Sequence, residues 1–187
     1  MSSVLIDRLT DLVVKKAFKY SREPVFKLVS GKMSSYYFNC KAVTLHPEGM
    51  YLIGTIIFER ISDMNIQGVG GLTLGADPVA YAVAYTSYLK KQPIEAFVVR
   101  KSPKSHGTMQ WIEGNLKRGD RIVIVDDVIT TGKSTIEAIQ RSKEAGLEVG
   151  KVIVLIDREE GGREAVEALG CSFDTIITRS EVMKRFR

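Results

Sequence analysis

Two adjacent carboxylates, Asp126 and Asp127, stand between an apolar run and a loop of small polar residues. The apolar run over 122–125 predicts a buried strand, and the loop over 130–134 opens a helix predicted over 133–145. A loop of this kind at a helix N-terminus presents backbone N–H groups and hydroxyls to a phosphate. The carboxylates beside it can accept hydrogen bonds from two adjacent sugar hydroxyls. The segment therefore predicts a site for a phosphorylated ribose.

Two other interpretations fit this segment less well. Gly132, Lys133 and Ser134 match the end of a Walker A loop, but that motif needs a glycine where this chain has Asp127. A carboxylate inside a polyphosphate cradle would repel the ligand. The second alternative is an ordinary strand end with one capping aspartate, but two acids followed by several small or polar residues exceed what capping needs. We therefore favour the sugar-phosphate site.

A second polar segment follows the apolar run over 96–99. Three cations and an imidazole lie close together there, contributed by Arg100, Lys101, Lys104 and His106. A loop with this composition can close over a departing polyanion, neutralise its charge and exclude water. The alternative is a basic loop that is only solvated and binds nothing. The segment over 126–134, which is predicted to bind a sugar phosphate, makes this alternative less favoured.

The remaining pattern predicts the elements that position these loops. The N-terminal part is expected to form a helix near 3–19, a strand, turn and strand over 25–29, 30–32 and 36–39, and a helix near 47–62. Short apolar runs then alternate with helical segments, as strands over 66–70, 96–99, 122–125, 152–156 and 175–177 and helices near 76–90, 133–145 and 162–169. Apolar strands alternating with helices indicate a parallel sheet covered on both faces, which binds ligands beyond the carboxyl ends of its strands.

The length of 187 residues suits one domain. We expect an α/β fold over 1–187, in which 1–45 form an accessory segment and 46–187 the α/β core. A hydrophobic content of 44% and a charged content of 26% exclude a disordered or fibrous chain.

Charge and cysteine content narrow the class of protein further. The net charge of +5 suits anionic ligands without being a nucleic-acid signature. The two cysteines, Cys40 and Cys171, give neither a disulfide framework nor a metal-binding spacing. We expect a cytoplasmic protein, because the first apolar run stops at Asp7 and the charge-poor stretch 68–89 is interrupted by polar residues and glycines. The basic C-terminus, 184–187, is expected to be solvated surface.

Residues 121–134 resemble the phosphoribosyl-pyrophosphate (PRPP) binding motif of the type I phosphoribosyltransferases. The loop that starts at Arg100 narrows the resemblance to the orotate phosphoribosyltransferase family, and segments 28–39, 69–78 and 156–158 agree with it. The resemblance runs from about residue 24 to 160. It implies a type I phosphoribosyltransferase fold, with a mostly parallel twisted sheet flanked by helices and a small N-terminal hood. It also implies the transfer of ribose 5-phosphate from PRPP to orotate.

The same resemblance implies the roles of individual residues. The catalytic set would be Lys101, Lys104, His106, Asp126 and Asp127. PRPP would be bound by these residues together with Arg100, Val128, Ile129, Thr130, Thr131, Gly132, Lys133 and Ser134. Orotate would be held by Thr130 and Arg158, whose guanidinium suits the orotate carboxylate.

Cofactor and partner expectations come from the family as well. Mg²⁺ would be bound mainly through the substrate, without a dedicated set of protein ligands. The protein would be a homodimer in which Lys101 acts on the site of the neighbouring subunit, with no nucleic-acid or membrane partner. Tyr37 and Phe38 would lie near the base, although core packing explains them equally well.

Two positions depart from the family pattern. Val29 and Leu74 stand where some members have lysine. The loop over 72–75 is therefore expected to bind the diphosphate through backbone N–H groups. Two alternatives stay open: a purine or uracil phosphoribosyltransferase, and a non-catalytic regulator built on the same fold.

Overall fold

A computed structural model describes residues 2–27, 31, 33–103 and 111–186. Its centre is a six-stranded sheet in the order β10-β9-β8-β5-β6-β7. The strands are β5 (Gly68–Leu72), β6 (Glu95–Val99), β7 (Ile112–Glu113), β8 (Arg121–Ile129), β9 (Glu148–Asp157) and β10 (Phe173–Thr178). All neighbours pair in parallel except β7, which is antiparallel to β6 at one edge. The predicted parallel sheet is confirmed, and β7 is an edge strand that the sequence pattern did not indicate.

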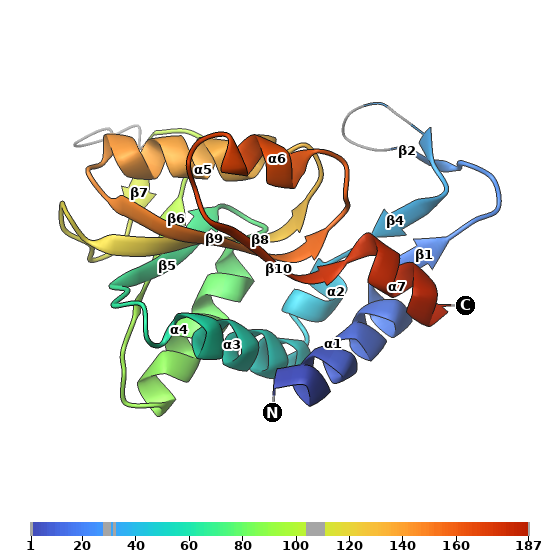
Figure 1. The fold of residues 1–187 in the computed structure, drawn as a ribbon, viewed down its shortest axis with the longest axis horizontal. Helices are drawn as coiled ribbons and strands as arrows, with labels where there is room; N and C mark the ends of the chain where they lie inside the picture. Colours follow the sequence, from blue (N-terminus) through green and yellow to red (C-terminus); the bar gives the residue numbers. More distant parts are fainter. Residues whose placement is uncertain (1, 28–30, 32, 104–110, 187) are drawn as a thin grey trace.

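Helices cover both faces of the sheet (Figure 1). One face carries α5 (Lys133–Glu144) and α6 (Gly162–Glu167), and the other carries α3 (Pro47–Ile61) and α4 (Asp77–Leu89), with α1 (Ser2–Lys16) packed on α3. Alternate side chains of β8 enter two separate apolar cores, Val123 and Val125 on the α3 side and Ile122 and Ile124 on the α5 side. This two-sided burial explains why the strands are continuous apolar runs in the sequence.

The bounds of the main helices follow from local signals that the sequence displays. Pro47 and Pro78 stand in the first turns of α3 and α4, where a missing N–H is tolerated. Gly146 follows the end of α5 with φ 83°, the left-handed conformation that terminates many helices. The predicted bounds of these helices are confirmed because capping residues, and not only periodicity, fix them.

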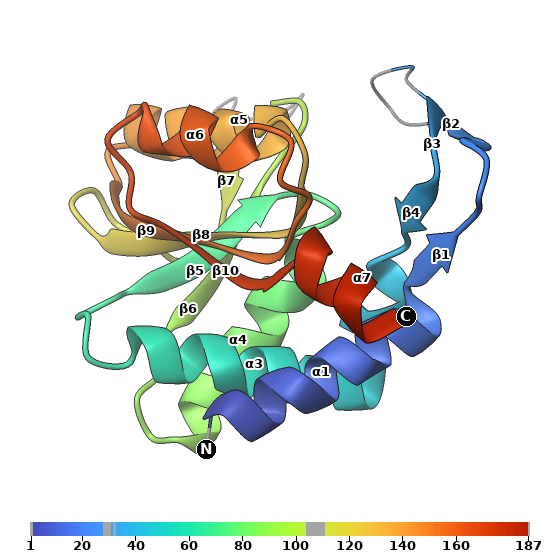
Figure 2. The ribbon, with the colours of Figure 1, turned by 45° about the vertical axis from the view of Figure 1, so that its right-hand side comes forward.

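The N-terminal hood consists of two short antiparallel ladders, which rise beside the sheet in Figure 2. The first pairs β1 (Phe18–Tyr20) with β4 (Tyr36–Phe38), and the second pairs β2 (Phe26–Lys27) with β3 (Met33–Ser34). A short helix, α2 (Lys41–Thr44), leads from the hood to α3.

This arrangement corrects two predictions about the N-terminus. The first helix ends at Lys16 and does not continue to 19, because Phe18 joins a strand and packs on Phe38 with ring centroids 5.1 Å apart. The strand near 25–29 pairs with β3, whereas 36–39 pairs with β1, so the predicted single hairpin is wrong. Aromatic side chains favour paired strands, and Phe18 and Phe38 lie directly opposite each other.

The C-terminus forms a helix, α7 (Arg179–Phe186), which the sequence analysis did not predict. Val182 is fully buried, and the ring of Phe186 lies 5.2 Å from that of Phe18. Arg185 binds Asp11 on α1 through two hydrogen bonds of 2.6 and 3.0 Å. The expectation of solvated surface is confirmed for Lys184 and Arg185, which are both exposed. Within the same helix, Arg185 is also paired with α1, and Phe186 packs on the hood.

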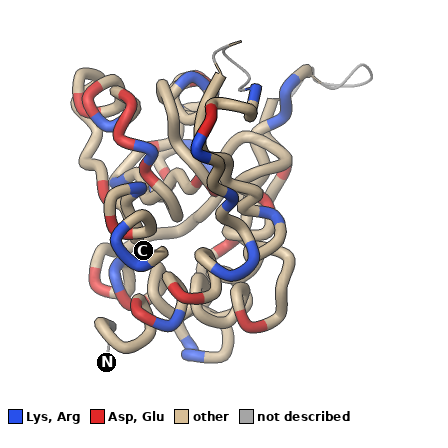
Figure 3. Tube along the Cα trace, turned by 90° about the vertical axis from the view of Figure 1, so that its right-hand side faces the viewer, with Lys and Arg blue, Asp and Glu red and all other residues tan. Residues whose placement is uncertain are grey.

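Charged residues of both signs are distributed along the chain on the side shown in Figure 3, without a segregated basic face. No helix within the described ranges is long and apolar enough to cross a membrane.

Candidate active site

The two adjacent carboxylates lie inside β8. The prediction that the strand ends before Asp126 and Asp127 is wrong, because β8 continues to Ile129. Pairing with β9 keeps the backbone extended past the carboxylates, and Asp126 stands opposite Val154 in this register. The strand thus places both carboxyl groups at the carboxyl end of the sheet, beside the loop over 130–134 that is predicted to bind a phosphate, here called the phosphate loop.

Asp126 fastens the start of α5 to the sheet. Its Oδ2 accepts hydrogen bonds from the hydroxyls of Ser134 and Thr135, both at 3.0 Å, and its Oδ1 accepts one from the Asp127 amide at 3.0 Å. These bonds are not an aspartate cap, because they join side chains, and the N-cap of α5 is Gly132, which has no side-chain cap hydrogen bond. The carboxylate holds the phosphate loop in place whatever else it binds.

Asp127 lies between Lys41 on α2 and the loop that follows β5. Its Oδ2 is 3.9 Å from Nζ of Lys41 on α2. A Cβ atom added at Gly75 would lie 2.6 Å from Oδ1 of Asp127, so the β5–α4 loop passes directly over this carboxylate. Asp127 is therefore in contact range of two segments that come from different parts of the chain.

Burial disfavours the charged forms of both carboxylates, and repulsion by Asp127 adds to this effect at Asp126. Burial, followed by the charge of Asp127, raises the pKa of Asp126 from 3.8 to about 7, and the hydroxyls of Ser134 and Thr135 oppose that rise. Burial also raises the pKa of Asp127, while the ammonium of Lys41 opposes the shift most strongly. Carboxyl groups with a raised pKa at the carboxyl end of a parallel sheet are typical of functional sites.

The phosphate loop has the form that the sequence predicted. Gly132 precedes α5 with φ 84°, a conformation that a side chain would strain. Lys133 and Ser134 occupy the first turn of α5, Thr131 is exposed and Thr130 is half-buried. Free N–H groups at a helix start and the helix dipole together favour an anion here.

The side chains of two residues in the predicted PRPP-binding segment pack in the apolar cores and do not face the site. Ile129 is buried in the core on the α5 side and Val128 packs against the core on the α3 side. Their side chains serve the fold, and only their backbone groups are available to a ligand.

The loop between β5 and α4 contributes backbone groups. The Thr73 amide donates to the Val99 carbonyl oxygen, and the Thr73 hydroxyl donates to Oδ2 of Asp77 at 2.6 Å. Among the described residues, the amides of Leu74 and Gly75 have no backbone partner. Leu74 points its side chain outward, with 59% of it exposed. Binding of a diphosphate by this loop stays a prediction, and Val29 lies outside the described residues.

The basic loop is described only in part. Arg100 forms an ion pair with Glu113 at 3.2 Å, and its Nε donates to the Ser102 carbonyl oxygen at 3.2 Å. Lys101 is exposed just beyond the carboxyl end of β6. Lys104 and His106 lie outside the described residues. Arg100 and Lys101 thus stand at the same edge of the sheet as the two carboxylates.

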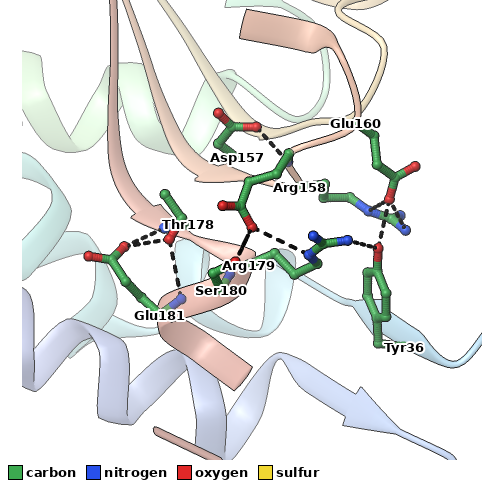
Figure 4. A network of polar contacts seen from close by, with 9 residues as sticks. Tyr36, Asp157, Arg158, Glu160, Thr178, Arg179, Ser180 and Glu181 are labelled. Atoms are coloured by element: carbon green, nitrogen blue, oxygen red, sulfur yellow. Dashed lines mark hydrogen bonds and ion pairs between the residues drawn. The ribbon is translucent and has the colours of Figure 1, made fainter. Parts of the chain in front are cut away.

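Arg158 follows β9 directly and is nearly buried, with 6% of its surface exposed. Its backbone N–H donates to the Ile129 carbonyl oxygen, which places it beside the end of β8. Figure 4 shows its side chain next to Glu160 and Tyr36. The structure therefore brings Arg158 to the end of the strand that carries Asp126 and Asp127, as the sequence predicted.

Of the two aromatic residues expected near the base, Phe38 is a core residue and Tyr37 is 41% exposed. Tyr37 stacks on Phe26 of the hood with ring centroids 6.0 Å apart. Core packing is thus the role that the structure gives to Phe38.

Sequence reasoning missed several residues that touch the site, namely Lys41, Thr135, Tyr36 and Glu160. Local spacing could not reveal Lys41 on α2 or Tyr36 in the hood, because they meet Asp127 and the segment after β9 only in three dimensions. Thr135 follows the predicted loop by one position, and an extended motif would have included it.

Comparisons with known proteins agree with this geometry. The phosphoribosyl transferase domain family matches residues 41–179. The orotate phosphoribosyltransferase of Aquifex aeolicus is 47% identical over 177 residues, which cover 95% of this chain and 97% of that protein. That of a Nostoc species is 42% identical, with 99% of this chain and 88% of the relative covered.

Solved structures agree with the sequence comparisons. The orotate phosphoribosyltransferase of Mycobacterium tuberculosis in complex with Fe(III) dicitrate has a TM-score of 0.84 and 37% identity, with 95% of this chain and 98% of that chain covered. The complex of the Mycobacterium tuberculosis enzyme with PRPP has a TM-score of 0.79 and 34% identity, over 96% and 99% of the two chains. The fold, the carboxylates of β8 and these similarities together show that the chain belongs to the orotate phosphoribosyltransferase family.

Proposed function

We propose that this protein transfers ribose 5-phosphate from PRPP to orotate, giving orotidine 5′-monophosphate and pyrophosphate for pyrimidine synthesis. The observation that carries the proposal is the placement of Asp126 and Asp127 on β8, directly before the phosphate loop, with Arg158 at the end of the adjacent strand. The two carboxylates suit the ribose, the phosphate loop suits the 5′-phosphate, and Arg158 suits the carboxylate of orotate in one ternary complex.

The reaction forms one bond and breaks another at the anomeric carbon of PRPP. A ring nitrogen of orotate attacks this carbon and gives up its proton, while the bond between the carbon and the diphosphate oxygen breaks and its electron pair leaves with the diphosphate. The transition state has oxocarbenium character. Ionised Asp127 would accept hydrogen bonds from the ribose hydroxyls and support the positive charge that develops on the sugar. Asp126 would hold the phosphate loop and contribute to the same negative field.

Orotate would be held at the junction of β8 and β9. The guanidinium of Arg158 has the fork geometry that a planar carboxylate needs, and its burial strengthens that interaction. Thr130 follows β8 at the same edge and would donate to the pyrimidine ring. Uracil lacks the carboxylate and would gain nothing from Arg158.

The leaving diphosphate would be neutralised by the basic loop. Arg100 and Lys101 lie beyond the end of β6, and Lys104 and His106 follow them in the sequence. Multiple negative charges on the leaving group make this neutralisation the largest electrostatic task in the reaction.

The oxygen donors at the site suit Mg²⁺ bound mainly through substrate. Asp126 already accepts three hydrogen bonds within the chain, so Asp127 is the carboxylate that would contribute to the ion. Among the described residues, no group of three or more His, Cys, Asp or Glu side chains gathers as a metal cage. When bound, the ion would neutralise charge on the diphosphate, and substrate oxygens would complete its octahedral shell.

A homodimer in which Lys101 serves the neighbouring subunit is part of the proposal. Helix α4 supports it, because Tyr81, Tyr85, Tyr88 and Leu89 project outward along one side at helical spacing, each at least 49% exposed. An exposed apolar stripe of this size suits an interface. We also propose the cytoplasm as the compartment, since Cys40 and Cys171 are buried free thiols that suit a reducing environment.

The test is orotate consumption, followed by absorbance, with PRPP and Mg²⁺, for the wild type and Lys101→Ala. Turnover by the wild type that collapses in the variant would support the substrate and the role of the loop. Turnover of adenine, hypoxanthine or uracil in place of orotate would contradict the proposal in favour of another phosphoribosyltransferase. Binding of PRPP without turnover of any base would identify a regulator.

A further inference from the structure

The guanidinium of Arg158 is held on one edge by a single carboxylate. Its Nε donates to Oε1 of Glu160 at 3.1 Å, and its Nη2 lies 2.9 Å from the same oxygen. The second contact is an ion pair that is not aligned as a hydrogen bond, so within the described part of the chain Nη2 is buried beside a carboxylate but has no aligned acceptor. A buried donor of this kind is costly unless a ligand supplies an acceptor.

Tyr36 of the hood supports the same carboxylate. Its hydroxyl donates to Oε1 of Glu160 at 2.8 Å, and its ring centroid lies 5.0 Å from the guanidinium carbon of Arg158 (Figure 4). A single tyrosine thus fixes the acceptor of Arg158 and approaches its guanidinium with an aromatic ring.

Helix α7 completes the arrangement from the other side. Nη1 of Arg179 donates to the Tyr36 hydroxyl oxygen at 3.0 Å, which leaves the hydroxyl proton for Glu160. Arg179 is itself placed by Glu159, whose Oε2 lies 3.4 Å from its Nε and accepts hydrogen bonds from the backbone and hydroxyl of Ser180. The chain of contacts runs from α7 through Tyr36 and Glu160 to Arg158.

We propose that Tyr36 and Glu160 are positioning residues that orient Arg158 for the carboxylate of orotate, with Arg179 of α7 as their support. The inference rests on the proposed function, in which Arg158 binds that carboxylate. Glu160 occupies the Nε and Nη2 edge of the guanidinium and would leave the N–H groups on its other edge for the substrate. Because the guanidinium is held before orotate arrives, less conformational entropy is lost on binding.

The arrangement would set specificity as well as affinity. A pyrimidine without a carboxylate cannot use the oriented guanidinium and leaves its buried donor unpaired. Loss of the orientation should therefore weaken the selection of orotate over uracil, and should leave the recognition of PRPP by the loop at α5 unchanged.

The experiment compares Tyr36→Phe with Tyr20→Phe as a matched control. Tyr20 stands opposite Tyr36 in the hood ladder, and its ring packs on Phe186, so the control removes a hydroxyl from the same ladder but outside this network. For Tyr36→Phe we expect the KM for orotate to rise about three- to tenfold, the effect of one buried hydrogen bond. The KM for PRPP should stay at the wild-type value. The Tyr20→Phe variant should keep both constants.

Glu160→Gln and Arg158→Lys separate the inference from the proposed function. Glu160→Gln should raise the KM for orotate and lower the preference for orotate over uracil, as Tyr36→Phe does. If Arg158→Lys weakens orotate binding while Tyr36→Phe and Glu160→Gln do not, the positioning role is wrong and the function stands. If Arg158→Lys leaves the KM for orotate unchanged, the assigned role of Arg158 is itself wrong. Equal losses toward orotate and PRPP in Tyr36→Phe would indicate general damage and overturn the inference.

Discussion

Gly75 and Asp127 approach each other so closely that no side chain fits between them. A Cβ atom at Gly75 would lie 2.6 Å from Oδ1 of Asp127 and 3.2 Å from Oδ1 of Asp126. The β5–α4 loop and the carboxylates of β8 therefore form a single surface. This contact places the backbone proposed for the diphosphate against the carboxylates proposed for the ribose, as a substrate carrying both groups on adjacent atoms requires.

Gly75→Ala should damage activity far more than stability. The added methyl group displaces the end of a flexible carboxylate and does not enter the packed core, so the free energy of unfolding should change by less than about 1 kcal/mol. Since Asp127 is proposed to position the ribose, we expect its displacement to lower kcat/KM for PRPP about ten- to a hundredfold. Steady-state kinetics and thermal unfolding of the same preparation check the two parts. A large loss of stability with unchanged kinetics would contradict this reading of the loop.

Asp126 should make the stability of the ligand-free protein depend on pH. Burial raises its pKa from 3.8 to about 7, so the folded state keeps a proton that the unfolded chain has lost in this range. The stabilising contribution is complete below the lower value and disappears as pH rises toward the upper one. Asp126→Asn removes the titrating group. The difference in melting temperature, variant minus wild type, should therefore increase from about pH 5 to pH 8. A difference that is constant with pH would contradict the shift.

A subunit-mixing experiment tests the action of Lys101 in trans. Lys101→Ala keeps intact carboxylates but has a defective loop, whereas Asp127→Asn keeps an intact loop but has a defective site. If the loop serves the neighbouring subunit, each mixed dimer contains one complete site. An equal mixture should then recover about a quarter of wild-type activity, because half of the dimers are mixed and each has one site of two.

The control is each variant alone, refolded or co-expressed under the same conditions, which should show almost no turnover. If the mixture is no more active than the sum of the two variants, the loop acts within its own subunit.

Much of this fold follows from signals that are local in the sequence. Continuous apolar runs reveal strands buried on both faces, and Pro47, Pro78 and Gly146 mark helix ends where the structure has them. The phosphate loop at Gly132 can be predicted equally well, because its small residues and the helix that follows are contiguous in the sequence. These features depend on residues a few positions apart, which periodicity and capping rules describe well.

What the sequence did not reveal depends on contacts between distant segments. The helix α7 is strongly charged, and only its burial of Val182 and its contact with the hood explain why it is ordered. The pairing of β1 with β4 needs Phe18 and Phe38 to meet across a segment that contains another ladder. The link from Arg179 to Tyr36 joins residues 143 positions apart. Rules based on spacing cannot anticipate such partners.

Lys41 gives a prediction about pH that sequence spacing could not suggest. Its ammonium lies 3.9 Å from Asp127 and counteracts the rise in the pKa of that carboxyl caused by burial. Lys41→Gln removes the counteracting charge, so the pKa of Asp127 should rise further. Because the ionised form is the one proposed to accept hydrogen bonds from the ribose hydroxyls, the acid limb of the pH profile of kcat/KM for PRPP should move to higher pH.

A conservative variant can show that the charge of Lys41, and not the shape of its side chain, sets the pKa of Asp127. Lys41→Arg keeps the cation and should leave the acid limb close to its wild-type position. Lys19→Gln, an exposed lysine of the hood outside the site, controls for the loss of one positive charge from the molecule. A profile of Lys41→Gln that falls uniformly without moving along the pH axis would mean that Lys41 acts on the substrate and not on the ionisation of Asp127.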